Sequence, residues 1–427
     1  MTHLNPRSKG WLKEYLKHRE HLFLDLAAGG HRAAHPDFSV YKTVQPTGLM
    51  YGQPVTPLEF SEAATWSTKD RLKLMLAESL IASCLLSDEV EQSDPEQISL
   101  SLARTLEEIN RYYQHVFPEL AASSRTFLGR KKETLELAEE IFERRVDKMD
   151  LKGPFWVRFF HSSLLFLDVY IFGQWKHAHA DRTVAEFFHY ERTELRNAVV
   201  RVMAVAAHAN RNVEFEERKL LEYFLQSAGL TSEQKKASRE IFENGMPVEN
   251  LDLPTANSWL LKKYFLEVAI LTFWADKRVQ DQEMDILVRL TSTLSLHPED
   301  MENSLLAVEA FVLEHWKELD SLQDRKSFEE VSVQFIQRMA AIAVKSKRKL
   351  LEETRATPEL VALLRLARST ELTADEKEQL RVLLIDLLRH IPALAMVSLP
   401  RHFMTLPVLM QILPKSFMAE VLDATGN

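Results

Sequence analysis

Apolar residues recur every three or four positions along most of the chain, the spacing that places them on one face of an α-helix. Helix-start signals accompany this period. Residues 94–97 (Asp-Pro-Glu-Gln) and 373–376 (Thr-Ala-Asp-Glu) each place a capping residue before an apolar segment, so both predict a helix. Residues 357–359 (Thr-Pro-Glu) open another, and residues 231–233 (Thr-Ser-Glu) open one after Gly229, which is placed to end the helix before it. These signals predict roughly fourteen to sixteen helices.

The helical period fails between about residues 29 and 67, where prolines and glycines cluster. Such a segment is typical of an ordered loop or a linker. A short β-like piece is expected at Phe38–Val44. Further breaks are expected at 118–130, at 244–256 and at 317–326.

Composition strengthens the helical prediction. Glycine supplies 11 of 427 residues, too few for the tight turns of an all-β or Rossmann-type fold, so we predict an all-α, multi-helix protein. The 53 lysines and arginines against 62 acidic residues give a net charge of −9, which excludes a generic nucleic-acid binder and predicts no DNA partner. The single cysteine, Cys84, cannot form an intramolecular disulfide, and the first residues lack a signal-peptide stretch, so a cytoplasmic location is expected.

An internal repeat is the most informative feature of the sequence. Shifting the chain by 66 residues superposes two segments with the same order of side chains, which predicts a tandem pair of small helical units at about 190–250 and 256–316. The matched pairs are Ala209 with Ala275, Asn210 with Asp276, Val213 with Val279, Glu217 with Glu283, Leu221 with Leu287, Leu230 with Leu296 and Glu233 with Glu299.

The second copy carries Ala-Asp-x-x-Val-x-x-x-Glu at residues 275–283, followed by a leucine-rich helix and a cap. This pattern resembles the TerB-like family, named for tellurite resistance, whose members are small helical bundles with an acidic turn. The first copy departs from it with Asn210 in place of the acid. Both copies lack the family's usual glycine, with Arg211 and Lys277 at that position. The resemblance covers roughly residues 190–316.

The chain from 372 to 422 is apolar and is divided by prolines at regular spacing. It resembles the proline-spaced segment of the LETM-like family, inner-membrane proteins linked to cation/proton exchange and ribosome association. This chain has Phe403 where those transporters carry an acidic residue after the equivalent of Pro400, which weakens the implication of transport. A chain that joins a TerB-like segment to a LETM-like segment resembles a bacterial LETM-related, biofilm-associated group. The prolines are Pro392, Pro400, Pro407 and Pro414.

A cation site is one interpretation of the acidic turn in the second copy, because Ca²⁺ and Mg²⁺ require several converging carboxylate oxygens. The candidate ligands are Asp276, Asp281 and Glu283. The spacing does not fit an EF-hand loop. The alternative is a polar turn whose acids favour the N-terminus of the next helix.

Residues 159–175 are strongly apolar and fit either a membrane span or a central core helix. Asp168 at its centre is costly in a membrane, which favours the core helix. His161 and Asp168, with histidines that follow, could form a metal or catalytic site. The alternative is a buried polar residue satisfied by hydrogen bonding. The other candidates are His177, His179, Asp181 and His189.

The stretch 391–414 could form a hairpin packed on the bundle or a segment that enters the membrane surface. Upstream, residues 345–349 (Lys-Ser-Lys-Arg-Lys) could contact anionic lipid or RNA, or form an ordinary solvated helix face. The predicted membrane or partner contacts are the four prolines and the basic side chains Lys345, Lys347, Arg348 and Lys349.

Together these observations predict an N-terminal helical region (1–150), a central domain with the tandem repeat (151–316) and a C-terminal region (317–427). The resemblances imply a non-enzymatic adaptor or sensor in envelope, ion-stress or biofilm physiology, acting in the cytoplasm or at the cytoplasmic face of the inner membrane. A LETM-like membrane component for cation/proton exchange or ribosome association is the alternative, and a metal-dependent enzyme is a third. The expected partner is a protein, a membrane surface or the ribosome, with no cofactor and no small-molecule substrate.

Overall fold

A computed structural model gives the fold. It describes residues 4–27, 36–53, 60, 63, 65–87, 95–121, 130–149, 151–152, 155–177, 185–208, 218, 221–222, 225–226, 230–254, 258–275, 281–318, 328–395, 397 and 399–423. The chain forms two compact units. The first comprises Met1–Ala269 and Asp281–Leu294, and the second comprises Ile270–Gln280 and Ser295–Asn427.

The predicted all-α class is confirmed. The described residues contain 19 α-helices joined by short 3-10 turns, and no strand is found among them. This exceeds the fourteen to sixteen helices expected, because several helices are short: α2, α3, α18 and α19 have nine residues or fewer.

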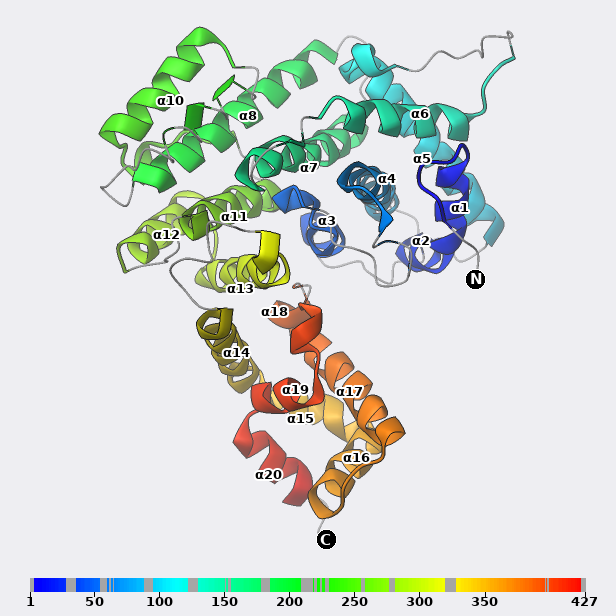
Figure 1. Cartoon of the computed structure of the whole chain (residues 1–427), viewed down its shortest axis with the longest axis vertical. Coiled ribbons are helices and arrows are strands. Elements are labelled where there is room, and N and C mark those ends of the chain that lie inside the picture. The colour runs from blue at the N-terminus through cyan, green and yellow to red at the C-terminus, as the bar shows by residue number, and fades with distance from the viewer. Residues whose placement is uncertain are drawn as a thin grey trace. The chain divides into compact units, whose positions relative to one another are not determined.

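The first unit is built around α4 (Thr68–Ser87) and α7 (Phe155–His177), two long helices packed against each other. Helices α1 (Trp11–His18), α2 (Glu20–Ala27), α5 (Pro95–Val116) and α6 (Thr134–Asp147) surround them, with the 3-10 turn η4 (Pro118–Leu120) after α5 (Figure 1). Every residue of α4 from Leu72 to Leu86 is buried, including Cys84. The prediction of a core helix over 159–175 is confirmed, because Leu164–Phe172 on α7 are all buried.

The segment expected to be a loop with a β-like piece is largely helical where the structure describes it. It forms α3 (Pro36–Val44) and the turns η1 (Gln45–Thr47) and η2 (Leu49–Tyr51). Pro36 occupies the first turn of α3, where its missing N–H costs nothing. Gly52 has φ +65°, and a Cβ there would lie 2.5 Å from the Phe159 carbonyl oxygen, so glycine allows η2 to pack directly on α7. Tertiary packing, rather than periodicity, makes this segment ordered.

The 66-residue repeat is visible in the helix boundaries. Helix α10 (Ser232–Asn244) and helix α13 (Pro298–Glu314) begin 66 residues apart, each with a capping box, at Thr231 and at His297. The preceding long helices are α8 (Ala185–His208) and α11 (Trp259–Ala275), and α12 (Asp281–Thr293) lies between α11 and α13. Of the breaks predicted at 118–130, 244–256 and 317–326, the second is confirmed where it is described, between α10 and α11, and contains η6 (Val248–Asn250). Residues 122–129 of the first break and 319–326 of the third lie outside the described residues.

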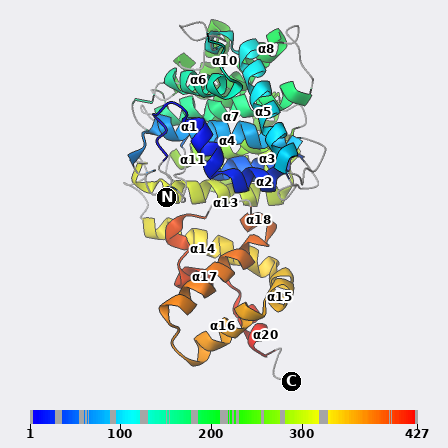
Figure 2. The ribbon, with the colours of Figure 1, turned by 90° about the vertical axis from the view of Figure 1, so that its right-hand side faces the viewer.

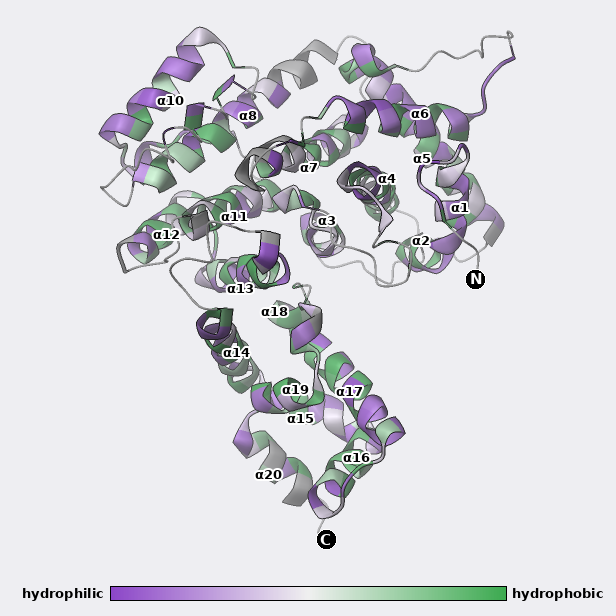
Figure 3. Ribbon diagram, viewed as in Figure 1, coloured by the Kyte–Doolittle hydropathy of each residue, from purple (hydrophilic) through white to green (hydrophobic). Residues whose placement is uncertain are grey.

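The second unit continues from α13 through η7 (Trp316–Glu318), α14 (Phe328–Lys345), α15 (Lys347–Arg355), α16 (Pro358–Ser369) and α17 (Ala374–Arg389). The predicted helix starts at 357–359 and 373–376 are confirmed. Apolar positions alternate with polar ones along these helices (Figure 3). This is the pattern of helices that bury one face.

The proline-spaced tail folds into α18 (Pro392–Ala395), the turn η9 (Arg401–Phe403), α19 (Leu406–Ile412) and α20 (Lys415–Asp423). Helix α19 packs on α14 and α17, and α20 packs on α15 and α16 (Figure 2). Phe403, Leu409, Ile412 and Phe417 are all buried. In the part of the chain that is described, no helix has both the length and the apolar character needed to cross a membrane.

Candidate functional site

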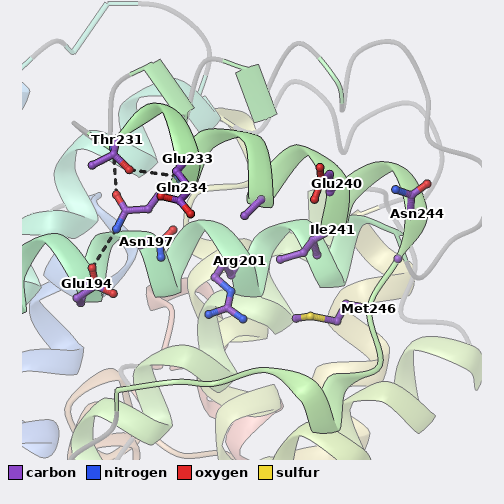
Figure 4. Close-up of a pocket in the computed structure, with 12 residues that line it drawn as sticks. Glu194, Asn197, Arg201, Thr231, Glu233, Gln234, Glu240, Ile241, Asn244 and Met246 are labelled. Carbon is purple, nitrogen blue, oxygen red and sulfur yellow. Dashed lines mark hydrogen bonds between the residues drawn. The ribbon is translucent and has the colours of Figure 1, made fainter.

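A groove runs between α8 and α10 in the first unit, with a volume of about 660 Å³ (Figure 4). We call it the α8–α10 groove. Helix α8 supplies Glu194, Asn197 and Arg201, and the remaining lining comes from α10 and the residues at its two ends. Those residues are Thr231, Glu233, Gln234, Ala237, Glu240, Ile241, Asn244, Gly245 and Met246.

One end of the groove is fixed by the capping chemistry that the sequence predicts. The hydroxyl of Thr231 accepts from the Gln234 backbone N–H at 3.2 Å, and the Gln234 side chain accepts from the Thr231 N–H at 3.0 Å. The same Gln234 amide donates to Glu194 Oε1 on α8 at 2.9 Å. The cap of α10 therefore also ties the two helices together.

The other end is fixed where both helices stop. Gly245 ends α10 with φ +74°, and a Cβ at this position would lie 2.4 Å from Cδ2 of His208, the last residue of α8. His208 Nδ1 lies 3.0 Å from the Phe242 carbonyl oxygen. Glycine at the end of α10 thus leaves room for the ring that joins the two helix ends.

The groove combines an apolar floor with an acidic rim. Ile241 is buried, and Glu233 and Glu240 are exposed on α10. With Glu194 these give three carboxylates against a single guanidinium, that of Arg201, which donates to the Asp252 carbonyl oxygen at 3.2 Å. A concave surface of this charge favours binding of a basic ligand.

Asn197 adds a polar anchor inside the groove. Its Oδ1 is buried and accepts no hydrogen bond from the described residues. A buried carbonyl oxygen without a donor costs free energy that a bound N–H group recovers. The groove therefore offers one specific hydrogen-bond acceptor in addition to its charge.

The predicted cation ligands are only partly described. Asp276 lies outside the described residues, Asp281 begins α12 without a described side chain, and Glu283 is fully buried on α12. No group of three His, Cys, Asp or Glu side chains suited to a metal ion occurs in the described ranges. The cation site stays a prediction.

Three of the predicted basic contacts, Lys345, Lys347 and Arg348, are paired within the second unit, and all but the half-buried Lys347 are exposed. Lys345 Nζ lies 2.8 Å from Glu302, and Lys347 pairs with Glu420 on α20. Arg348 is 95% exposed and lies 3.5 Å from Glu352, and Lys349 is also exposed. This arrangement fits a solvated helix face.

The four predicted prolines divide into two kinds. Pro392 and Pro407 are exposed in the first turns of α18 and α19, whereas Pro400 and Pro414 are buried. They do not form one shared surface patch, because half of them lie in the interior of their unit. Their contact with a membrane or partner stays a prediction.

The histidine-rich middle of the chain gives one clear result. His179 and Asp181 lie outside the described residues, and the side chains of His161, His177 and His189 are not described. Asp168 is fully buried, and its Oδ2 lies 2.5 Å from Nε of Arg145. Asp168 is buried as expected, and its Oδ2 has a partner on α6 that no local pattern could identify, whereas its Oδ1 accepts no hydrogen bond from the described residues.

Comparison with known proteins gives one limited similarity. The chain is similar to the co-chaperone protein DjlA of Vibrio cholerae, with 29% identity over 117 residues. The matched segment makes up 26% of this chain and 41% of that protein. The chain thus spans less than half the length of this curated relative. No protein-family model matches the chain. No solved structure matches it.

Proposed function

We propose that this protein is a non-enzymatic helical adaptor that binds a basic segment of a partner protein in the α8–α10 groove. The observation that carries the proposal is the acidic, partly apolar groove with the unpartnered Asn197 oxygen at its wall. The similarity to a co-chaperone over about a quarter of the chain supports a role in binding other proteins.

The dimensions of the groove suit a helical ligand. Helix α10 has 13 residues, which corresponds to about 20 Å of helix. A partner helix lying along it would place apolar side chains over Ile241 and Met246 and basic side chains beside Glu233 and Glu240. Envelope, ion-stress or biofilm physiology is the setting that the TerB-like and LETM-like resemblances imply for such an adaptor.

The membrane alternative receives less support from the packing. Several apolar side chains of the tail, including Leu409 and Ile412, are buried within the second unit, whereas Leu406, Val408 and Met410 are half-buried. Flotation of the intact chain with vesicles containing anionic lipid tests this alternative. Co-flotation that disappears when Arg348 and Lys349 are changed to Gln would favour the LETM-like role over the adaptor.

A matched pair of peptides tests the adaptor proposal directly. One is an amphipathic helix of about four turns with lysines on its polar face, and the other carries glutamates at the same positions. Fluorescence anisotropy with the intact chain should show saturable binding of the lysine peptide, and added salt should weaken it. Equal binding of both peptides, or of neither, contradicts the proposal.

Variants locate the binding to the groove. Glu233→Lys combined with Glu240→Lys should reduce the affinity for the lysine peptide by about tenfold or more, since both reverse the charge of the rim. Glu243→Lys is the matched control, because Glu243 is exposed on α10 but lies outside the groove lining. A similar loss in Glu243→Lys would show that only the overall charge matters.

A further inference from the structure

A second polar cluster lies in the first unit, where α5 packs against α6, α7 and α8, and α7 packs against α8. We call it the arginine cluster. It contains Arg145, Arg192 and Arg196, together with Asp168 and the paired tyrosines Tyr112 and Tyr113. None of these residues contributes to the α8–α10 groove.

Arg145 pairs with one oxygen of Asp168, Oδ2, whereas Asp168 Oδ1 is buried and accepts no hydrogen bond from the described residues. In addition to the 2.5 Å contact between them, the Tyr113 hydroxyl lies 3.5 Å from Asp168 Oδ2, and the Tyr112 hydroxyl donates to the Asp168 backbone oxygen at 3.1 Å. Burial opposes the charge of Arg145, but the Asp168 carboxylate raises the pKa of this guanidinium. One oxygen of the Asp168 carboxylate is thus engaged by Arg145.

Arg192 and Arg196 have no such partner. The Nε atoms of both are buried and make no hydrogen bond to the described residues. Arg192 instead places Cζ 4.2 Å from the centre of the Phe117 ring, a cation–π contact. Glu119, the other acid that acts on them, is exposed.

The environment of both groups opposes their charge. Burial lowers the pKa of Arg192. Burial, and then the positive charges of Arg192 and Arg145, lower the pKa of Arg196 to about 9. Arginine stays protonated at neutral pH, so the cluster holds three guanidinium groups against two carboxylates, the buried Asp168 and the exposed Glu119.

Such a surplus of largely buried positive charge favours the binding of an anion. An uncompensated buried charge costs several kcal/mol, which a bound counter-ion recovers. Guanidinium groups present parallel N–H donors that fit phosphate and carboxylate oxygens in pairs. Two guanidinium groups one helical turn apart offer more paired N–H donors than the two oxygens of one carboxylate can accept, which favours the three terminal oxygens of a phosphate group.

We propose that Arg192 and Arg196, with Arg145 behind them, form a binding site for the phosphate group of a small soluble anion. The two α8 side chains, one helical turn apart, would donate to the phosphate oxygens. Arg145 and Asp168 would hold the wall of the site in place. The proposal is independent of peptide binding in the α8–α10 groove.

Thermal unfolding of the intact chain tests the site, with inorganic phosphate and phenyl phosphate as probes and sodium chloride at equal ionic strength as reference. Phosphate at about 100 times its Kd should raise Tm by about 5 °C in excess of chloride. A similar rise with phenyl phosphate would indicate that the site accepts monoesters, and a rise with inorganic phosphate alone would restrict it to the free ion. No excess over chloride with either probe would overturn the proposal.

Variants separate binding from general stabilisation. Arg196→Met and Arg192→Met should each abolish the phosphate-dependent rise in Tm. Arg196→Lys should retain part of that rise, since lysine keeps the positive charge but lacks the paired N–H donors of the guanidinium group. Arg111→Met is the matched control, because Arg111 on α5 is half-exposed and pairs with Glu108. Titration calorimetry should give one phosphate per chain. If Arg192→Met and Arg196→Met both kept the full phosphate-dependent rise in Tm, the assignment of the phosphate site to these residues would be overturned.

Discussion

The first unit contains two buried ionic clusters that differ in charge balance. In one, Lys263 and Glu267 on α11 lie 3.6 Å apart, both essentially without exposure, and the hydroxyls of Tyr41 and Tyr51 donate to Glu267 at 2.5 and 2.8 Å. We call this the Glu267 cluster. In the arginine cluster, one buried carboxylate faces three guanidinium groups.

The difference indicates two roles for buried charge. The Glu267 cluster pairs one cation with one anion and adds cation–π contacts from Lys263 to Tyr41 and Trp259, so the protein itself compensates its charges. It joins α11 to α3 and η2. The arginine cluster leaves charge uncompensated by the protein. We infer that the first cluster stabilises the fold and that the second is arranged for a ligand.

The largest effect on the free energy of unfolding is expected in the Glu267 cluster. Glu267→Leu removes the carboxylate that pairs with fully buried Lys263, and should lower the free energy of unfolding by about 3–5 kcal/mol in urea titrations. The double variant Lys263→Met with Glu267→Leu should recover most of this loss, since neither charge then remains buried. A loss below about 1 kcal/mol in the single variant would contradict the comparison.

The opposite change in the free energy of unfolding is expected when a charge is removed from the arginine cluster. In phosphate-free buffer, Arg196→Met removes a buried charge that the described residues do not pair, and should raise the free energy of unfolding by about 1–3 kcal/mol. The same urea titration measures it, with Arg111→Met expected to be nearly neutral. Destabilisation of Arg196→Met in this buffer would mean that the protein already compensates the charge.

Alkaline pH should affect both clusters alike. Burial, followed by the charge of Glu267 for Tyr51 and of Asp168 for Tyr112, raises the pKa of each phenol well above 10. Above about pH 10 the unfolded chain loses these protons while the folded chain keeps them, so stability is complete below that pH and falls as pH rises. Tyr51→Phe and Tyr112→Phe should each make the decline shallower by about 1.4 kcal/mol per pH unit. Stability measured from pH 9 to 11.5 checks this, and an unchanged slope in both variants would contradict it.

The smallest effect is expected at the exposed basic run of the second unit. Lys345 and Glu302 are 65% and 42% exposed, so Lys345→Gln should change the free energy of unfolding by less than about 1 kcal/mol. Raising the salt concentration should remove even that difference. A larger, salt-resistant loss would show that this pair behaves like the buried clusters.

The sequence predicted local structure well and long-range partners poorly. The capping boxes at Thr231 and Thr373 set the starts of α10 and α17, because their hydrogen bonds join residues only three apart. Helix α3 was missed, since its order depends on packing against α4 rather than on its own periodicity. The acidic groove was missed because its carboxylates come from two helices, Glu194 from α8 and Glu233 and Glu240 from α10.

The sequence by itself determined the all-α class, the 66-residue spacing of the repeat and the burial of Asp168, since helix period and capping act over a few residues. Only the tertiary structure decided that Asp168 pairs with Arg145, 23 residues away, and that Arg192 and Arg196 share its surroundings. It also decided that the proline-spaced tail buries its apolar residues within its own unit. Charge balance and burial depend on which helix faces pack together, and that is a property of the packed chain and not of any local segment.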